Sequence, residues 1–196
     1  TAGQAYVFDG VANDFVQVNL SQNLTFSSKD EMSMFSSFKL TNTPNQHGFA
    51  VLSLNNPKYR LMINSNRSPL YDAGEHYDVN VGGVTFNLNT WYHFGLTVKA
   101  GGESKLYVDG QFVHSSNQGV PSQLPDGSSF AIARAGSATY DFTGSIDEVR
   151  IYDRALSAAE VAALYQMESE LPAGSVTLDK LAPELQNLLD GNGTIE

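Results

Sequence analysis

The chain has 196 residues, of which 41% are hydrophobic and 11% aromatic, a composition typical of a globular protein that buries about 70% of its unfolded surface. Its formal net charge of −10, from 21 acidic and 11 basic residues, argues against nucleic-acid partners and anionic membrane surfaces. The absence of cysteine excludes disulfides, thiolate metal sites and thiol catalysis. No apolar run approaches the roughly 20 residues that membrane insertion needs. Thr1–Gln4 lacks the features of a signal peptide, so we expect a mature form or an excised domain.

Short runs of alternating apolar and polar residues, separated by turn-forming residues, occupy most of the chain. The clearest of them are Val16–Leu20, Met32–Phe38, Tyr92–Val98, Leu106–Val108 and Phe130–Ile132. A period of two predicts strands with one face toward a core. Asp109 and Gly110 between two such runs predict a type I′ hairpin, because both central residues of that turn have positive φ. The pattern predicts an all-β, antiparallel sandwich of about 11 to 13 strands.

The segment Gly144–Tyr165 predicts a final strand that leads directly into a short helix. Ser157 and Glu160 have the spacing of a capping box, and Leu156 and Val161 have that of a hydrophobic staple. In the strand, we expect Asp147 to lie on the core-directed face with Val149 and Ile151. A carboxylate in that position is costly unless a partner satisfies it.

The composition changes after this helix, so we divide the chain into a domain over residues 1–168 and a tail over 169–196. The breaker Glu170–Gly174 precedes a stripe of leucines at helical spacing, formed by Leu181, Leu185, Leu188 and Leu189. Pro183 suits the first turn of this short amphipathic helix and Gly191 its C-terminal cap. Three roles stay open: the stripe docks on the sandwich, it joins copies of the chain into a homo-oligomer through residues 175–196, or it is a linker.

Four motifs in order resemble a known family. Tyr6–Val16 is similar to the opening strand F-D-G-x-x-D-[YF]-V of the bacterial laminin-G-like domains, which belong to the concanavalin A-like lectins and glucanases. Asn89–Phe94 and Lys105–Gly110 look like the central W-Y-H and L-Y-V-D-G strands of that family. Gly144–Ser157 matches its closing strand and helix. The resemblance covers Thr1 to about Tyr165 and implies a jelly-roll sandwich of two antiparallel sheets.

The resemblance also implies a secreted or cell-surface bacterial protein that binds a glycan or an extracellular protein without catalysis. Many members hold a structural calcium, which would fall here on Asp9 and Asp147, with carbonyls from the Phe26–Asp30 stretch. Calcium takes six to eight oxygen ligands, and a site that ties the first strand to the last would neutralise an inward-facing Asp147. The alternative is that Asp147 accepts backbone N–H groups in a turn.

Glycan-cleaving enzymes of this fold use paired carboxylates on one strand, and the chain has no such run. Asp147 and Glu148 are adjacent and are expected to face opposite sides of a strand. None of the four histidines has metal-ligand spacing with another, and we interpret His93 as structural. A glycan-active hydrolase therefore ranks last among the functions that we consider.

The polar and aromatic run Arg67–Asp78 is the candidate ligand-binding loop. Aromatic faces stack on sugar rings, and carboxylates or amides bind sugar hydroxyls. Tyr71, Asp72, His76 and Tyr77 supply these groups, joined by Tyr140 and Asp141 from a later loop. The alternative is an ordinary loop whose tyrosines pack on the sheet edge. We expect Trp91, in the W-Y-H motif, to be buried.

We therefore expect a non-catalytic, lectin-like recognition module with a structural calcium. The competing hypothesis is an assembly module of an adhesin or fibre, in which the helix predicted within residues 175–196 joins the protomers.

Overall fold

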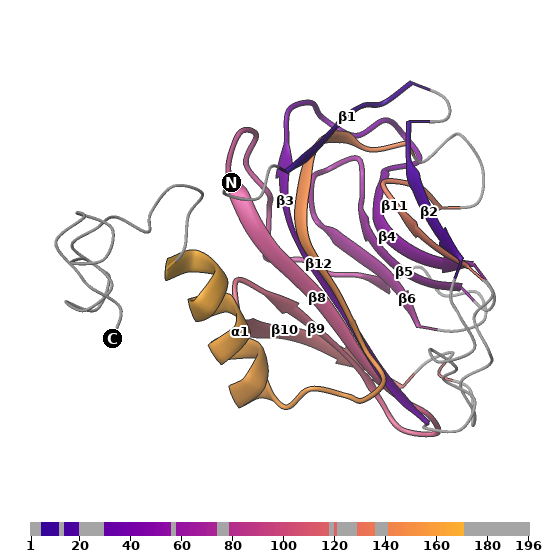
Figure 1. The fold of residues 1–196 in the computed structure, drawn as a ribbon, viewed down its shortest axis with the longest axis vertical. Helices are drawn as coiled ribbons and strands as arrows, with labels where there is room; N and C mark the ends of the chain where they lie inside the picture. Colours follow the sequence, from indigo (N-terminus) through magenta and orange to yellow (C-terminus); the bar gives the residue numbers. More distant parts are fainter. Residues whose placement is uncertain are drawn as a thin grey trace, which may run out of the picture.

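The computed structural model describes residues 5–11, 14–19, 30–55, 58–73, 79–117, 120, 129–135 and 141–170. Within these residues, two six-stranded antiparallel sheets pack face to face, and one helix covers the outer side of one of them (Figure 1). This architecture confirms the predicted concanavalin A-like jelly-roll sandwich, and its twelve strands agree with the number expected from the alternating runs. None of the described residues forms a helix long and apolar enough to span a membrane.

The two sheets interleave segments from the whole chain. Sheet A has the strand order β1 (Tyr6–Asp9), β12 (Thr143–Tyr152), β3 (Glu31–Leu40), β8 (Trp91–Lys99), β9 (Ser104–Val108) and β10 (Gln111–Ser116). Sheet B has the order β2 (Val16–Asn19), β11 (Ser129–Ile132), β4 (Phe49–Asn55), β5 (Lys58–Ile63), β6 (Pro69–Ala73) and β7 (Val79–Asn80). The first and last strands of the described domain are therefore neighbours in sheet A.

The core lies between the sheets and is built from alternate residues of each strand. On β3 and β8, for example, Met34, Phe38, Phe94 and Leu96 face inward and are fully buried. Asp109 and Gly110 both have positive φ, of 49° and 73°, and they join β9 to β10 in the predicted tight hairpin.

Because of a bulge in β12, Asp147 lies on the opposite face of the sheet from the one predicted. Asp147 pairs with Ser37 on β3, but the next paired residue is Arg150, so the register shifts between them. Glu148 occupies the bulge with a φ of 50°. The extra residue reverses the alternation: Val149 packs against the core, whereas Asp147 lies with Ser37 on the outer face. The expectation that Asp147 faces the core is therefore wrong.

Helix α1 (Ala158–Glu170) forms a third layer on the outer face of sheet A (Figure 1). The predicted capping box is confirmed: the Glu160 N–H donates to Ser157 Oγ at 3.3 Å, and the Ser157 N–H donates to Glu160 Oε2 at 2.8 Å. The helix buries a small second core with the sheet, which consists of Phe35, Tyr107, Leu156, Val161 and Leu164. The predicted staple pair, Leu156 and Val161, therefore lies inside this contact.

The tail predicted after the helix lies outside the described residues. The helix continues to Glu170, two residues past the expected boundary at residue 168. The leucine-striped helix within 175–196, and its role in a homo-oligomer, stay predictions.

Gly95 leaves the space that the ring of Phe35 occupies on the outer face of sheet A. A Cβ on Gly95 would collide with ring atoms of Phe35, which is fully buried under α1. Gly95→Ala is expected to lower the free energy of unfolding by about 1–3 kcal/mol, because the added methyl group overpacks this contact. Urea denaturation measures the loss. Gly82→Ala is the matched control, since its Cβ would meet no atom within 4 Å, and equal midpoints for the two variants would contradict the prediction.

Candidate functional site

The two predicted calcium ligands, Asp9 and Asp147, lie on neighbouring strands but at different positions along them. Asp9 pairs with Thr143, four residues before Asp147, which corresponds to about 13 Å along a strand. Asp9 is exposed, and its Oδ1 accepts the Val11 N–H at 2.9 Å. Asp147 accepts the Glu148 N–H at 2.8 Å, as in the alternative interpretation. The two carboxylates do not fit one calcium ion, and the described residues contain no group of three His, Asp or Glu suited to a metal.

Tyr71 and Asp72, predicted to bind ligand from a loop, are instead buried in strand β6. Their exposed fractions are 0% and 1%. Tyr71 faces the core, and Asp72 lies on the outer side of sheet B, where it forms an ion pair with Arg60. The prediction of direct ligand contact is wrong for both residues, because β6 pairs with β5 along its whole length and is no loop.

Three of the other predicted ligand residues cannot be compared with the prediction. His76, Tyr77 and Tyr140 lie outside the described residues, as do the carbonyls of residues 26–29. Their proposed roles stay predictions. Asp141 is described: it is 6% exposed, and burial raises the pKa of its carboxyl group.

An open groove of about 770 Å³ lies beside β10 and β7, the edge strands of the two sheets. One wall is the β8–β9 turn, with Gly101, Gly102 and Glu103. The others are the end of β10, from His114 to Ser116 with Asn117 after it, and Val79 of β7. The lining offers an imidazole, two hydroxyls, an amide and a carboxylate, which together can donate and accept several hydrogen bonds.

A hydrogen-bond network on the core side of the groove holds its lining residues in place. Nδ1 of His114 lies 3.1 Å from the hydroxyl of Tyr71, and this contact fixes the orientation of the imidazole ring. Ser104 donates to the Ser116 carbonyl at 3.0 Å and anchors the end of β10. Burial raises the pKa of Tyr71, so its phenol stays neutral. Tyr71 thus supports the groove although it does not line it.

The charge on the groove comes from Glu103 at its rim. Lys105 Nζ lies 2.8 Å from Glu103 Oε1, and this hydrogen bond lowers the pKa of Glu103. The carboxylate is therefore ionised at neutral pH and available as an acceptor. The groove was not predictable from one stretch of sequence, because three separate segments of the chain form it. The available signal was the polar run from His114 to Asn117 at the end of a strand.

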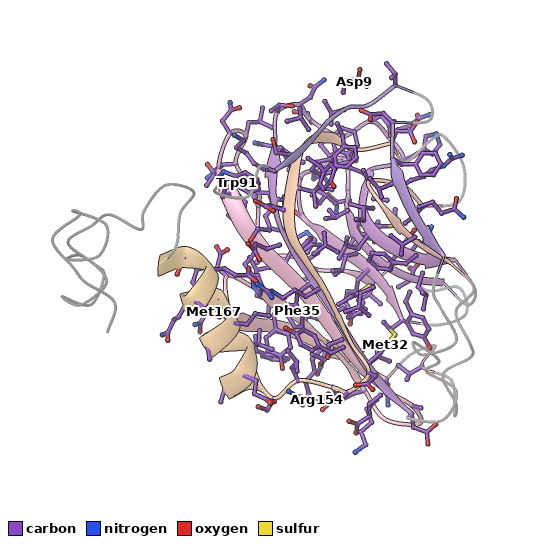
Figure 2. All side chains as sticks on the ribbon, in the orientation of Figure 1. Asp9, Met32, Phe35, Trp91, Arg154 and Met167 are labelled. Carbon is purple, nitrogen blue, oxygen red and sulfur yellow. The ribbon has the colours of Figure 1, made fainter. Side chains whose placement is uncertain are left out.

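Trp91 is 43% exposed, which overturns the expectation that it is buried. The W-Y-H motif alternates in β8, so that Tyr92 packs toward the core while Trp91 and His93 lie on the outer face. Lys39 Nζ lies 5.3 Å from the centroid of the Trp91 ring. Figure 2 shows Trp91 near the start of β8, beyond the end of α1.

His93 is buried between sheet A and α1 in a group of charged residues. Its ring stacks on Phe35 with centroids 5.3 Å apart, and its Nε2 lies 3.6 Å from Glu168 Oε2. Glu168 accepts hydrogen bonds from Arg150 Nε at 2.9 Å and from Ser37 Oγ at 3.3 Å. Burial, with the positive charge of Arg150, lowers the pKa of His93 to about 4. Burial raises the pKa of Glu168 although Arg150 opposes this shift.

The family of the chain is shown by comparison with known proteins. A family model described as the concanavalin A-like lectin/glucanases superfamily matches residues 10–162. The chain belongs to this superfamily. No curated protein sequence matches the chain.

Solved structures with a similar fold include both enzymes and binding proteins. A sialidase from Trypanosoma rangeli, in complex with 2,3-difluorosialic acid, is 21% identical with a TM-score of 0.64, over 84% of this chain and 27% of the sialidase. A heptameric SAP-like pentraxin from Limulus polyphemus is 13% identical with a TM-score of 0.63, over 81% and 80% of the two chains. The binding domain of Botulinum neurotoxin serotype G is 15% identical with a TM-score of 0.64, over 86% and 46%. At these identities the likeness shows the fold alone.

The separation of Asp9 and Asp147 predicts how the protein responds to calcium. Asp147→Asn is expected to keep the rise in melting temperature that calcium gives the wild type over EDTA, because Asp147 is separated from Asp9 and belongs to no described group of three His, Asp or Glu side chains suited to a metal. Differential scanning calorimetry in the two buffers measures the rise, and Asp9→Asn is the companion variant. Loss of the calcium response in both variants would show that the two residues bind one ion.

Burial of His93 predicts a loss of stability in acid. The unfolded imidazole gains a proton near pH 6.5, whereas the folded one does so only near pH 4. The resulting stabilisation is complete above pH 6.5 and is lost as the pH falls, and the loss amounts to roughly 3 kcal/mol by about pH 4. The raised pKa of Glu168 acts in the opposite direction, so the comparison with His93→Gln isolates the histidine. Urea midpoints at pH 7, 5.5 and 4.5 are expected to fall more steeply in the wild type, and parallel profiles would contradict the assignment.

Proposed function

We propose that this domain is a non-catalytic recognition module that binds carbohydrate in the groove between the β8–β9 turn and the end of β10. The observation that carries the proposal is the lining itself: several hydrogen-bonding groups of different kinds converge on one open groove at the sheet edge. Membership of the lectin/glucanase superfamily makes a sugar the first ligand to consider.

The chemistry of the lining suits a neutral, hydroxyl-rich ligand. Each sugar hydroxyl both donates and accepts, and the groove offers acceptors at Glu103 and Asn117 and donors at His114, Ser115 and Asn117. The net charge of −10 disfavours acidic sugars such as sialic acid. The ring of His114 is already held by Tyr71, so less conformational entropy is lost when a ligand binds.

An extracellular location belongs to the same proposal, because laminin-G-like domains are typically extracellular. An extracellular protein ligand is the second candidate, and two of the similar structures are described as binding domains, one of Botulinum neurotoxin serotype G and one of Paraclostridial Mosquitocidal Protein 1. The edge strand β10 favours it, since Phe112 on this strand is 55% exposed. A structural calcium remains part of the proposal, but Asp9 and Asp147 do not supply a joint site for it.

The test is binding to a panel of neutral and acidic oligosaccharides, followed by calorimetric titration of the best ligand. Asn117→Ala and Ser115→Ala are each expected to weaken binding about three- to tenfold, as the loss of one hydrogen bond costs about 0.5–1.5 kcal/mol. Gln111→Ala is the matched control, because it removes an exposed amide at the opposite end of the same strand.

Two outcomes would refute this proposal. Equal affinity for all three variants would move the site away from the groove, and turnover of any oligosaccharide by the wild type would show that the domain is catalytic.

A further inference from the structure

A row of four side chains crosses the outer face of sheet A beyond the end of α1. Val7 pairs with Ser145, Ser145 with Lys39, and Lys39 with Trp91, so these residues lie side by side on four neighbouring strands. We call them the Trp91 row. Val7 is 74% exposed and Trp91 is 43% exposed, whereas Lys39 is half-buried and Ser145 is buried between its neighbours. The row therefore presents an apolar residue at each end and the stem and ammonium of a lysine between them.

The Trp91 row continues the surface that α1 already covers. The last turns of α1 are fixed to the neighbouring row of the sheet, where Glu168 accepts a hydrogen bond from Ser37. Lys39 follows Ser37 by two residues, or about 7 Å along β3. The described chain ends at Glu170, two residues after Glu168, and Figure 2 shows Trp91 beyond this end of α1.

The chain beyond Glu170 has the length and the pattern to cover this row. It comprises residues 171–196, in which the leucine stripe from Leu181 to Leu189 is predicted to be one face of a helix. The 11 residues from Glu170 to Leu181 can reach about 36 Å. Four neighbouring strands span about 14 Å, slightly more than the roughly 10–12 Å width of a helix.

Charge also favours this arrangement. The stripe and the residues that flank it, 179–190, contain Asp179, Glu184 and Asp190 against one basic residue, Lys180. On a helix, Glu184 lies beside the stripe, next to Leu181 and Leu188. The cation of the Trp91 row is Lys39, whose Nζ stands over the Trp91 ring. An acidic residue that flanks an apolar stripe thus complements a cation that lies between two apolar residues.

We infer that the segment Leu181–Leu189 of the same chain docks on the Trp91 row, with its leucines against Val7 and Trp91 and with Glu184 near Lys39. Tethering to α1 favours this intramolecular contact, since a short linker gives a high effective concentration. The segment then extends the third layer that α1 begins. This inference is independent of the carbohydrate groove.

Trp91 is the only tryptophan in the chain, so its fluorescence reports on this row alone. In the full chain, Leu185→Asp combined with Leu188→Asp is expected to shift the emission to longer wavelength and to raise the acrylamide quenching constant. Gln186→Asp combined with Asn187→Asp is the matched control, because it adds the same charge away from the stripe. It is expected to leave both quantities as in the wild type. Equal quenching in all three proteins would overturn the inference.

A cross-link distinguishes the same chain from a second copy, because the protein has no cysteine of its own. Val7→Cys combined with Leu188→Cys is expected to form an intramolecular disulfide on mild oxidation, seen by non-reducing electrophoresis and mass spectrometry. Val18→Cys combined with Leu188→Cys is the control, since Val18 is also exposed, at 42%, but lies on sheet B. Disulfide-linked dimers, or equal cross-linking in the two proteins, would overturn the intramolecular contact.

Discussion

Phe35 and Tyr107 project from the outer face of sheet A, and without α1 both rings would be exposed to water. Covering them is the constraint on which the rest of the structure depends. Gly95 leaves room for the Phe35 ring, and the capped start of α1 directs Leu156 and Val161 onto it. An apolar contact of this kind stabilises in proportion to the area removed from water. The contact between α1 and sheet A also buries charged residues, and these residues need oppositely charged partners within the interface.

The charged residues beside the contact between α1 and sheet A account for the bulge in β12. The bulge at Glu148 brings Arg150 to the outer face, where it binds both Glu148 at 2.6 Å and Glu168 at 2.9 Å. A buried Glu168 without Arg150 would be an unpaired charge, which is costly. The bulge therefore serves the packing of α1. The groove lies at the free edge of the sandwich, where Tyr71 and His114 connect the core to the surface. The polar residues of the groove are thus separate from the contact between α1 and sheet A.

Local sequence patterns predicted the structural features that depend only on residues close together in the sequence. The alternation of Met32–Phe38 and Tyr92–Val98 defined the inward faces, and the capping box of Ser157 and Glu160 defined the start of α1. Predictions failed where a contact distant in sequence decided the outcome. Pairing with β5 makes a strand of the segment that contains Tyr71.

The sequence by itself determined the class of fold, the position of the helix and the family, because period-two alternation, turn residues and caps act over a few residues. Only the tertiary structure decided which carboxylates and aromatic residues meet. Asp9 and Asp147 are on adjacent strands as expected, yet the register separates them by four positions. Register is set by the packing of both whole sheets, and a single bulge reverses the face of every later residue. No local pattern in Gly144–Tyr152 records that shift.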